Sequence, residues 1–255
     1  MEKNAEKDRR PRLSAQVSGA DREGLSMLHL KKRDGTDYPE SQRWWIFTIL
    51  MFVGGYFGAF TYTIRGGVFC NAQTANFVLF AMAAGDTHWG KALYYLIPMS
   101  AYFLGAFLSE AARTSDRWRL PAQWETVLVG VEMVAVLILG LLPETAPFQI
   151  SQVVINFICS MQYNTFRVAE GVPMATTFCT NHLRQTGIAC CMALRTRERQ
   201  YVRRSLCHLG MLAVFVLGGV LSTVLCRRIQ GKAIWVALLP LTWVLVDLLR
   251  ADLEQ

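Results

Sequence analysis

The chain has little charge for its length. Charged residues make up 18% of its 255 residues and hydrophobic residues 53%, whereas soluble domains average roughly 25% charged residues. The charge is also uneven, because residues 1–43 hold ten Lys/Arg and eight Asp/Glu. The remainder contains uncharged runs near the ~20 residues that a helix needs to cross a bilayer: 44–64, 66–85, 145–166 and 205–226. This pattern excludes an ordinary soluble domain and predicts an all-α, polytopic transmembrane helix bundle.

The chain also lacks the residue patterns of metal centres and catalytic sites. None of its seven cysteines forms a Cys-x-x-Cys pair, and all lie within or beside apolar runs, so we expect reduced, buried thiols. No acid-rich metal motif is visible, and His182 with Thr180 is the nearest approach to a nucleophile–base pair. We therefore expect no metal, no cofactor and no enzymatic activity.

A cleavable signal peptide is not expected either. The first apolar run begins only at Trp44, lacks a small-residue cleavage pattern and is followed by many further apolar runs. A net charge of +7 is compatible with nucleic-acid binding, but the arginines after the tail lie in short loops between apolar runs. Lipid headgroups and membrane topology account for that placement. The expected partner is therefore the lipid bilayer, and no nucleic acid is expected.

The order of the apolar runs predicts three parts. Residues 1–40 are polar and dense in charge, and we expect a disordered cytoplasmic tail. Residues 41–142 and 143–255 form two transmembrane repeats. Six runs are predicted to cross the membrane: 44–64, 92–110, 125–142, 148–166, 205–226 and 233–249. Two further segments, 68–84 and 172–192, are shorter or more polar and are ambiguous.

The distribution of Lys and Arg favours about six crossings. If the two ambiguous segments enter the membrane without crossing it, the cytoplasmic loops 110–124 and 167–204 carry ten Lys/Arg. The outer loops 65–91, 143–148 and 227–232 then carry five. If both segments cross, six lie inside and eight outside, against the positive-inside rule. We therefore expect a cell inner-membrane protein with a cytoplasmic N-terminus.

A faint internal repeat links the two halves. Thr74 matches Thr180 at a spacing of 106 residues (180 − 74), and Leu104-Gly-Ala-Phe-Leu-Ser109 matches Leu217-Gly-Gly-Val-Leu-Ser222 at 113 (217 − 104). With three crossings in each repeat, an odd number, the halves have opposite orientation. Inverted repeats of this kind place interrupted helices near the midplane in several transporter folds.

One polar segment in each half is the main candidate for a site. Glycines or a proline precede each segment and would interrupt a helix there. Polar side chains at bilayer depth either line a wet cavity or hydrogen-bond between helices, and the sequence leaves both readings open. The candidate binding residues, including two at the end of the run before the second segment, are Asn71, Gln73, Thr74, Asn76, Gln162, Asn164, Thr176, Thr177, Thr180, Asn181 and His182.

Ionisable residues inside the apolar sequence form a second group of candidates. Glu132 lies in the middle of an apolar run, where a charge costs several kcal/mol, so it is neutral, faces water or pairs with an arginine such as Arg184. Arg65 and Arg167 lie where runs end and are expected to anchor at the interface. Gly54 and Gly58 form a small-xxx-small pair that predicts close helix packing, within one protomer or in a homo-oligomer.

The same segments resemble the YoaK family, uncharacterised multi-pass membrane proteins of prokaryotes. The resemblance covers roughly residues 41–249 and rests on Phe52-Val-Gly-Gly-Tyr56, Arg65-Gly-Gly-Val-Phe-Cys-Asn-Ala-Gln-Thr-Ala-Asn76 and Ala175-Thr-Thr-Phe-Cys-Thr-Asn-His-Leu-Arg184. This chain has Gly58-Ala59 where Asp-Ala is usual and Thr74-Ala75-Asn76 where Thr-Gly-Asn is usual. The resemblance implies a bacterial inner-membrane protein and carries no established activity.

Three functions are compatible with these features. The paired polar breaks favour a transporter or channel for a small polar or anionic solute, with its site between the repeats. A membrane scaffold or sensor that acts through partner proteins, using the tail and the arginine-rich loop, is the alternative. A lipid-modifying membrane enzyme ranks behind both, because no catalytic constellation is visible.

Overall fold

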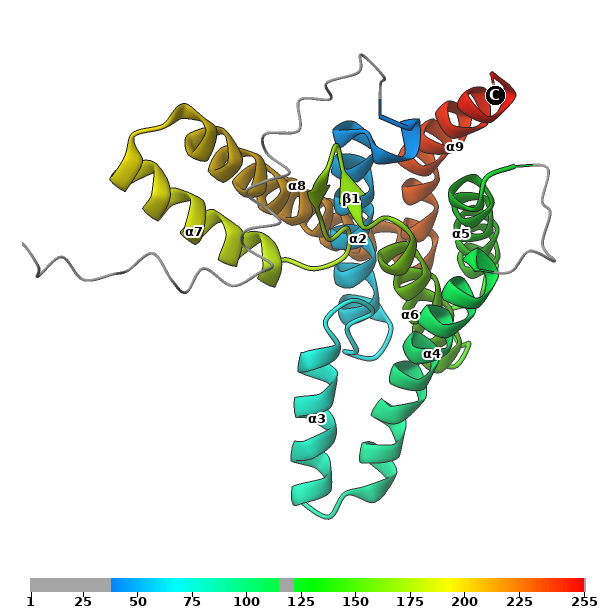
Figure 1. Ribbon diagram of the computed structural model, residues 1–255. Helices are drawn as coiled ribbons and strands as arrows, with labels where there is room; N and C mark the ends of the chain where they lie inside the picture. The colour runs from blue at the N-terminus through cyan, green and yellow to red at the C-terminus, as the bar shows by residue number, and fades with distance from the viewer. Residues whose placement is uncertain (1–37, 115–121, 255) are drawn as a thin grey trace, which may run out of the picture.

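The computed structural model describes residues 38–114 and 122–254, so most of the expected tail lies outside the described residues. Nearly all of the described chain is helical (Figure 1). The only strands within these ranges are β1 (Val168–Ala169) and β2 (Val172–Pro173), which pair as a short antiparallel hairpin. The helices are η1 (Glu40–Gln42), α2 (Trp44–Ile64), α3 (Gln73–Gly85), α4 (Trp89–Arg113), α5 (Trp124–Leu141), α6 (Phe148–Thr165), α7 (Thr180–Thr196), α8 (Arg199–Ile229), η2 (Gln230–Ala237) and α9 (Leu238–Leu253).

Helix α2 lies at the centre and is apolar on all sides, as expected of a helix buried in a bundle. It packs along α8, and α6 packs along α4. Both contacts bring backbones together at a glycine: a Cβ atom added at Gly218 would lie 2.1 Å from the Phe52 carbonyl oxygen, and one at Gly105 would lie 2.4 Å from that of Phe157. Small residues permit this close approach between membrane helices.

The helix pairs repeat in the two halves of the chain. The first helix of each half packs on the third helix of the other half, α2 on α8 and α6 on α4. The second and third helices of each half form a hairpin, α3 with α4 and α7 with α8, and the two hairpins extend in different directions (Figure 1). The last helices, α5 and α9, contact each other. Two halves related by a two-fold axis would pair in this way. The boundary between the two repeats, at residues 142 and 143, stays a prediction.

Helices α2 and α6 run antiparallel. At one end, the Trp44 amide at the start of α2 donates to Glu170, just after α6, at 3.4 Å. At the other end, Gln152 near the start of α6 donates through Nε2 to the carbonyl oxygen of Arg65, just after α2, at 2.6 Å. The loops that follow α2 and α6 therefore leave the bundle from opposite ends.

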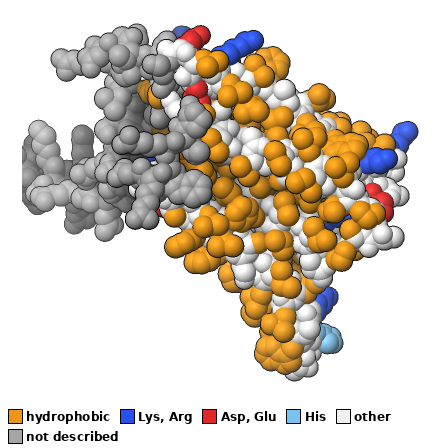
Figure 2. All heavy atoms as spheres, turned by 90° about the vertical axis from the view of Figure 1, so that its right-hand side faces the viewer, with side chains coloured by type: hydrophobic (Ala, Val, Ile, Leu, Met, Phe, Trp, Pro, Cys, Tyr) orange, Lys and Arg blue, Asp and Glu red, His pale blue; other side chains and the backbone are white. Residues whose placement is uncertain are grey.

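The outside of the bundle is apolar. In Figure 2, hydrophobic side chains cover most of the face that includes α4 and α5, and charged side chains lie mainly at its margins. Exposed residues on these two helices include Phe103, Phe107, Val134 and Ile138. An exposed apolar surface of this extent is typical of contact with lipid. The protein is an all-α helical membrane bundle.

Four described segments have the length and apolar composition of a membrane span: Trp44–Ile64, Trp89–Arg113, Trp124–Leu141 and Arg199–Leu253. The last has 55 residues and contains both α8 and α9, which were expected to cross separately. Helix α6, also expected to cross, is not among them although it has 18 residues. Its polar residues include Gln152, Asn156 and Gln162, all fully buried within the bundle, so this helix contacts protein more than lipid.

Candidate functional site

The two polar segments meet on one face of α2, at Gly54 and Gly58. The Nδ2 atom of Asn71, in the first segment, donates to the Gly54 carbonyl at 2.9 Å, and a Cβ atom at Gly58 would lie 2.9 Å from that nitrogen. A Cβ atom at Gly54 would lie 2.7 Å from the carbonyl oxygen of Thr176, in the second segment. The predicted small-residue pair therefore seats the two polar segments, whereas Gly55 makes the close contact with α8.

A cavity of about 720 Å³ lies between the two segments. Its wall includes Phe69–Thr74 of the first segment, apart from Cys70, and Thr177–Thr180 of the second. The remaining lining comes from α2, α4, α6 and α8. Five of the predicted binding residues line this cavity: Asn71, Gln73, Thr74, Thr177 and Thr180. The volume lies within the range of ~300–1,000 Å³ that is usual for small-molecule sites.

The first segment is folded by Asn76. After α2 ends, Gly66 and Gly67 adopt positive φ angles of 82° and 70°, which turn the chain back toward the bundle. Asn76 then closes the loop, since its Nδ2 donates to the Phe69 carbonyl at 2.6 Å and its Oδ1 accepts from the Phe69 amide at 3.2 Å. Its side chain is fully buried, so the structure places this predicted binding residue behind the cavity wall.

Replacing Asn76 is expected to loosen the first segment. The substitution Asn76→Leu leaves the Phe69 amide and carbonyl without partners, and each unpaired buried group costs about 1–3 kcal/mol. We expect a free energy of unfolding lower by about 2–4 kcal/mol, measured by thermal or denaturant unfolding in detergent. The matched control is Phe77→Leu on the neighbouring, 59% exposed position. Equal stability of both variants would contradict the role assigned to Asn76.

The second segment is held by a histidine pair. Glu170 and Gly171, with φ angles of 46° and 80°, form the turn of the β1–β2 hairpin that follows α6. Further on, His182 Nε2 lies 2.8 Å from the Ala175 carbonyl oxygen, and its Nδ1 lies 3.0 Å from His208 Nδ1 on α8. His182 is fully buried and does not line the central cavity. It connects the second segment to α8.

A row of amide side chains on α6 holds the cavity residue Gln73 in place. The sequence did not predict these amides as part of the site. Asn156 Oδ1 accepts from Gln73 Nε2 at 2.8 Å, and Asn156 Nδ2 donates to the Gln152 carbonyl at 2.8 Å. Gln152 Nε2 also lies 2.6 Å from the Tyr94 hydroxyl. The sequence feature that could have revealed them is the i, i+4 spacing of Gln152 and Asn156, which puts two amides on one face of an apolar helix.

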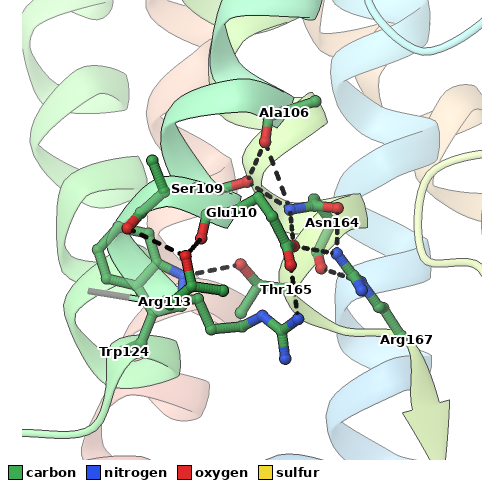
Figure 3. A network of polar contacts seen from close by, with 10 residues as sticks. Ala106, Ser109, Glu110, Arg113, Trp124, Asn164, Thr165 and Arg167 are labelled. Atoms are coloured by element: carbon green, nitrogen blue, oxygen red, sulfur yellow. Dashed lines mark hydrogen bonds and ion pairs between the residues drawn. The ribbon is translucent and has the colours of Figure 1, made fainter. Parts of the chain in front are cut away.

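A second polar cluster lies at the end of α6 (Figure 3). Asn164 Nδ2 donates to Ser109 Oγ at 2.8 Å and to Glu110 Oε2 at 3.1 Å, and Arg167 forms an ion pair with Glu110 at 2.5 Å. Asn164, Arg167 and Asn181 also line an outer cavity of about 460 Å³. Asn164 and Asn181 therefore lie in this outer cavity and not in the central one.

Aromatic pairs stand between the central cavity and its two neighbours. Tyr163 and Phe178, with ring centroids 4.4 Å apart, line both the central cavity and the outer cavity beside Arg167. Phe69 lines the central cavity and stacks at 4.4 Å on Tyr62, which lines a third cavity beside Glu144. Because α2 and α6 are antiparallel, the two outer cavities lie at opposite ends of these helices.

A comparison with known protein families identifies the family of this chain. Residues 46–246 match the family model described as "Protein of unknown function (DUF1275)". The chain belongs to the DUF1275 family. No curated protein and no solved structure matches it. The narrower resemblance to YoaK proteins stays a prediction. Because the DUF1275 family is described as having unknown function, membership in it gives no activity for the central cavity.

The remaining candidate residues of this DUF1275 protein lie outside the central cavity. Gln162 Nε2 donates weakly to the Leu50 carbonyl at 3.4 Å, and Thr176 is fully buried against α2. Glu132 is fully buried on α5, and neither of its carboxyl oxygens has a hydrogen-bond partner among the described residues. Arg184 is exposed and bonds to Asn181 at 3.3 Å, so the pairing considered for Glu132 and Arg184 is absent.

Arg65 is the one predicted interfacial anchor that the structure places differently. Its side chain is 1% exposed, lies 5.6 Å above the Phe60 ring and contacts Glu144 at 3.3 Å. Glu144 in turn accepts from the Gly231 amide at 2.8 Å. Arg65 thus joins the ends of α2 and α8 within the protein. Within residues 38–114 and 122–254, no group of three or more His, Cys, Asp or Glu side chains is placed to hold a metal ion.

Proposed function

We propose that this protein is a transporter or channel for a small polar or anionic solute, which binds in the central cavity. The observation that carries the proposal is that the polar segments of both halves line one cavity, with Asn71 and Gln73 on one wall and Thr177 and Thr180 on the other. Asn71 and Gln73 each donate a hydrogen bond within the protein, and the Thr177 hydroxyl has no partner among the described residues. All four residues line a space large enough for a ligand, which side chains that served only to join helices would not require.

The arrangement of the neighbouring cavities supports passage through the bundle. One aromatic pair, Tyr163 and Phe178, separates the central cavity from an outer cavity at the end of α6. The other pair, Tyr62 and Phe69, stands toward an outer cavity at the end of α2. A central site with a narrow barrier toward each end is what alternating access requires.

The proposed orientation follows the positive-inside rule. The start of α2 lies beside the loop after α6, where the Trp44 amide donates to Glu170, and Thr48 contacts Met211 in the middle of α8. The arginines near that end include Arg43, which precedes α2, and Arg167, which follows α6. We place this end, and with it the N-terminus, in the cytoplasm of a cell with the protein in its inner membrane.

Solute flux into proteoliposomes tests the proposal. The purified chain is reconstituted, and uptake of a labelled panel of sugars, amides, organic acids and inorganic anions is compared with empty liposomes. We expect saturable uptake of at least one class, together with an increase in melting temperature by the same solute, because binding to the folded state stabilises it. If no solute of the panel is taken up and none raises the melting temperature, the result would contradict transport and favour the scaffold or sensor role.

A further inference from the structure

Two helices begin at the wall of the central cavity. Gln73 is the first residue of α3, Thr180 is the first residue of α7, and both line the cavity. The preceding residues, Ala72 and Cys179, make no capping hydrogen bond through their side chains. In α3 the amides of Ala75 and Asn76 bond to the Ala72 carbonyl, so the amides of Gln73 and Thr74, with those at the start of α7, are left for another acceptor. Each helix N-terminus carries about half a positive elementary charge.

A buried polar group without a partner lies in the wall of the same cavity. Thr177 lines the cavity and is 0% exposed, yet its hydroxyl has no hydrogen-bond partner among the described residues. Tyr102 on α4 lines the same cavity. Buried polar groups are nearly always satisfied, so the unpartnered hydroxyl indicates a ligand that supplies the missing hydrogen bond.

The charge of the cavity limits the charge of its ligand. None of the described residues that line it is Lys, Arg, His, Asp or Glu. The only built-in positive potential comes from the two helix N-termini, which together amount to about one elementary charge. A single negative charge is balanced by this potential, whereas a second one would be desolvated without compensation. A cation would find no carboxylate and would face two positive helix ends.

The rest of the wall is apolar and aromatic. Rings from the two segments and three surrounding helices contribute to it, and the cavity of about 720 Å³ is far larger than an inorganic ion needs. Aromatic side chains pack favourably against flat rings. The five rings are Phe69, Tyr102, Tyr163, Phe178 and Phe215.

We propose that the central cavity binds a monovalent organic carboxylate with a flat, apolar body, with the carboxylate at the N-termini of α3 and α7 and the body among the aromatic rings. The proposal rests on the proposed function, because it names the solute class of the same cavity. The hydroxyls of Thr177 and Tyr102 then donate hydrogen bonds to the carboxylate.

A set of four probes of similar size tests the charge rule. Binding to the full-length protein in nanodiscs is measured by calorimetry for benzoate, neutral benzamide, the dianion isophthalate and the cation benzylammonium. We expect benzoate to bind at least tenfold more tightly than each of the other three. Binding of any of these three as tight as that of benzoate would overturn the monoanion assignment.

A charge placed at the start of α7 tests the location. In Thr180→Asp, the new carboxylate favours the helix N-terminus and therefore folding, but it repels a bound anion. We expect benzoate to bind at least tenfold more weakly to this variant than to Thr180→Asn, which removes the hydroxyl without adding charge. Thr196→Asp adds the same charge at the far end of α7, outside the cavity, and should leave benzoate affinity within twofold of the unmodified protein.

The outcomes separate the two proposals. Equal benzoate affinity in Thr180→Asp and Thr180→Asn would show that the carboxylate binds away from the N-terminus of α7 and would overturn this inference. If benzoate fails to bind but another solute of the flux panel is transported, the carboxylate assignment is wrong and the transport function stands. If no probe binds and no solute of the panel moves, both proposals fail.

Discussion

Replacing Gly218 by alanine is expected to separate α2 from α8 and to give a large loss of stability for a change of one methyl group. The added Cβ atom would lie 2.1 Å from the Phe52 carbonyl oxygen and 3.1 Å from the Tyr56 amide nitrogen, so the two backbones must move apart by about an ångström to restore normal contact. Overpacking costs typically ~1–3 kcal/mol, and a clash with backbone lies at the upper end of that range or beyond it. We expect a free energy of unfolding lower by at least about 3 kcal/mol.

The neighbouring glycine provides the matched control. A Cβ atom at Gly219 would lie 3.6 Å from the Gly55 carbonyl oxygen and 3.8 Å from the Ala59 Cβ atom, which are ordinary contacts. Since alanine favours a helix over glycine by about 1 kcal/mol, Gly219→Ala should be neutral or stabilising. Thermal unfolding in detergent measures both variants. A Gly218→Ala protein as stable as Gly219→Ala would show that α2 and α8 do not approach as described.

Filling the central cavity is expected to give the largest loss of activity. Thr180 is exposed and lines the cavity at the start of α7, so tryptophan at this position has room to extend into the space without disturbing the packed core. The ring would occupy the place of the solute and cover the N-terminus of α7. We expect the uptake of any transported solute by Thr180→Trp to fall at least tenfold, with the melting temperature within about 4 °C of the unmodified protein, a change of roughly 1 kcal/mol or less.

The control for the cavity variant is a tryptophan on the same helix away from the cavity. Leu194, near the end of α7, is 82% exposed and does not line the cavity. Leu194→Trp should retain uptake within twofold of the unmodified protein. If Thr180→Trp retained full uptake as well, the solute would follow another path, and the central cavity would not be the transport site.

Several features of this site were accessible from residue types and spacing. The polar groups at 71–76 and 176–182 interrupt apolar sequence, and the structure brings Asn71, Gln73, Thr74, Thr177 and Thr180 to one cavity. Other predicted binding residues, including Asn76 and His182, are buried and do not line this cavity. A buried amide or imidazole satisfies its hydrogen bonds wherever the fold offers a partner, and spacing within one segment does not reveal that partner. The same reason hides Gln152 and Asn156, whose partners lie 87 and 83 residues away in the chain.

The prediction that Arg65 anchors at the membrane interface rested only on its position at the end of an apolar run, and the residues packed around it give a different result. An arginine at the end of an apolar run is usually interfacial. Here Glu144 and the Phe60 ring surround it, and its side chain is 1% exposed. Only the packing of the ends of α2 and α8 brings these groups together.

Hydropathy and residue spacing were enough to predict a helical membrane protein, the places where its helices are interrupted and the polar groups at two of these interruptions. These properties follow from hydropathy and local backbone preference, which act within one segment. Other features became visible only in the folded chain: both interruptions meet on the glycine face of α2, and two uncapped helix starts share one cavity. Among the described residues, no charged side chain lines that cavity. The meeting of two segments that lie about 100 residues apart in the chain depends on how whole helices pack, and local preferences do not specify that packing.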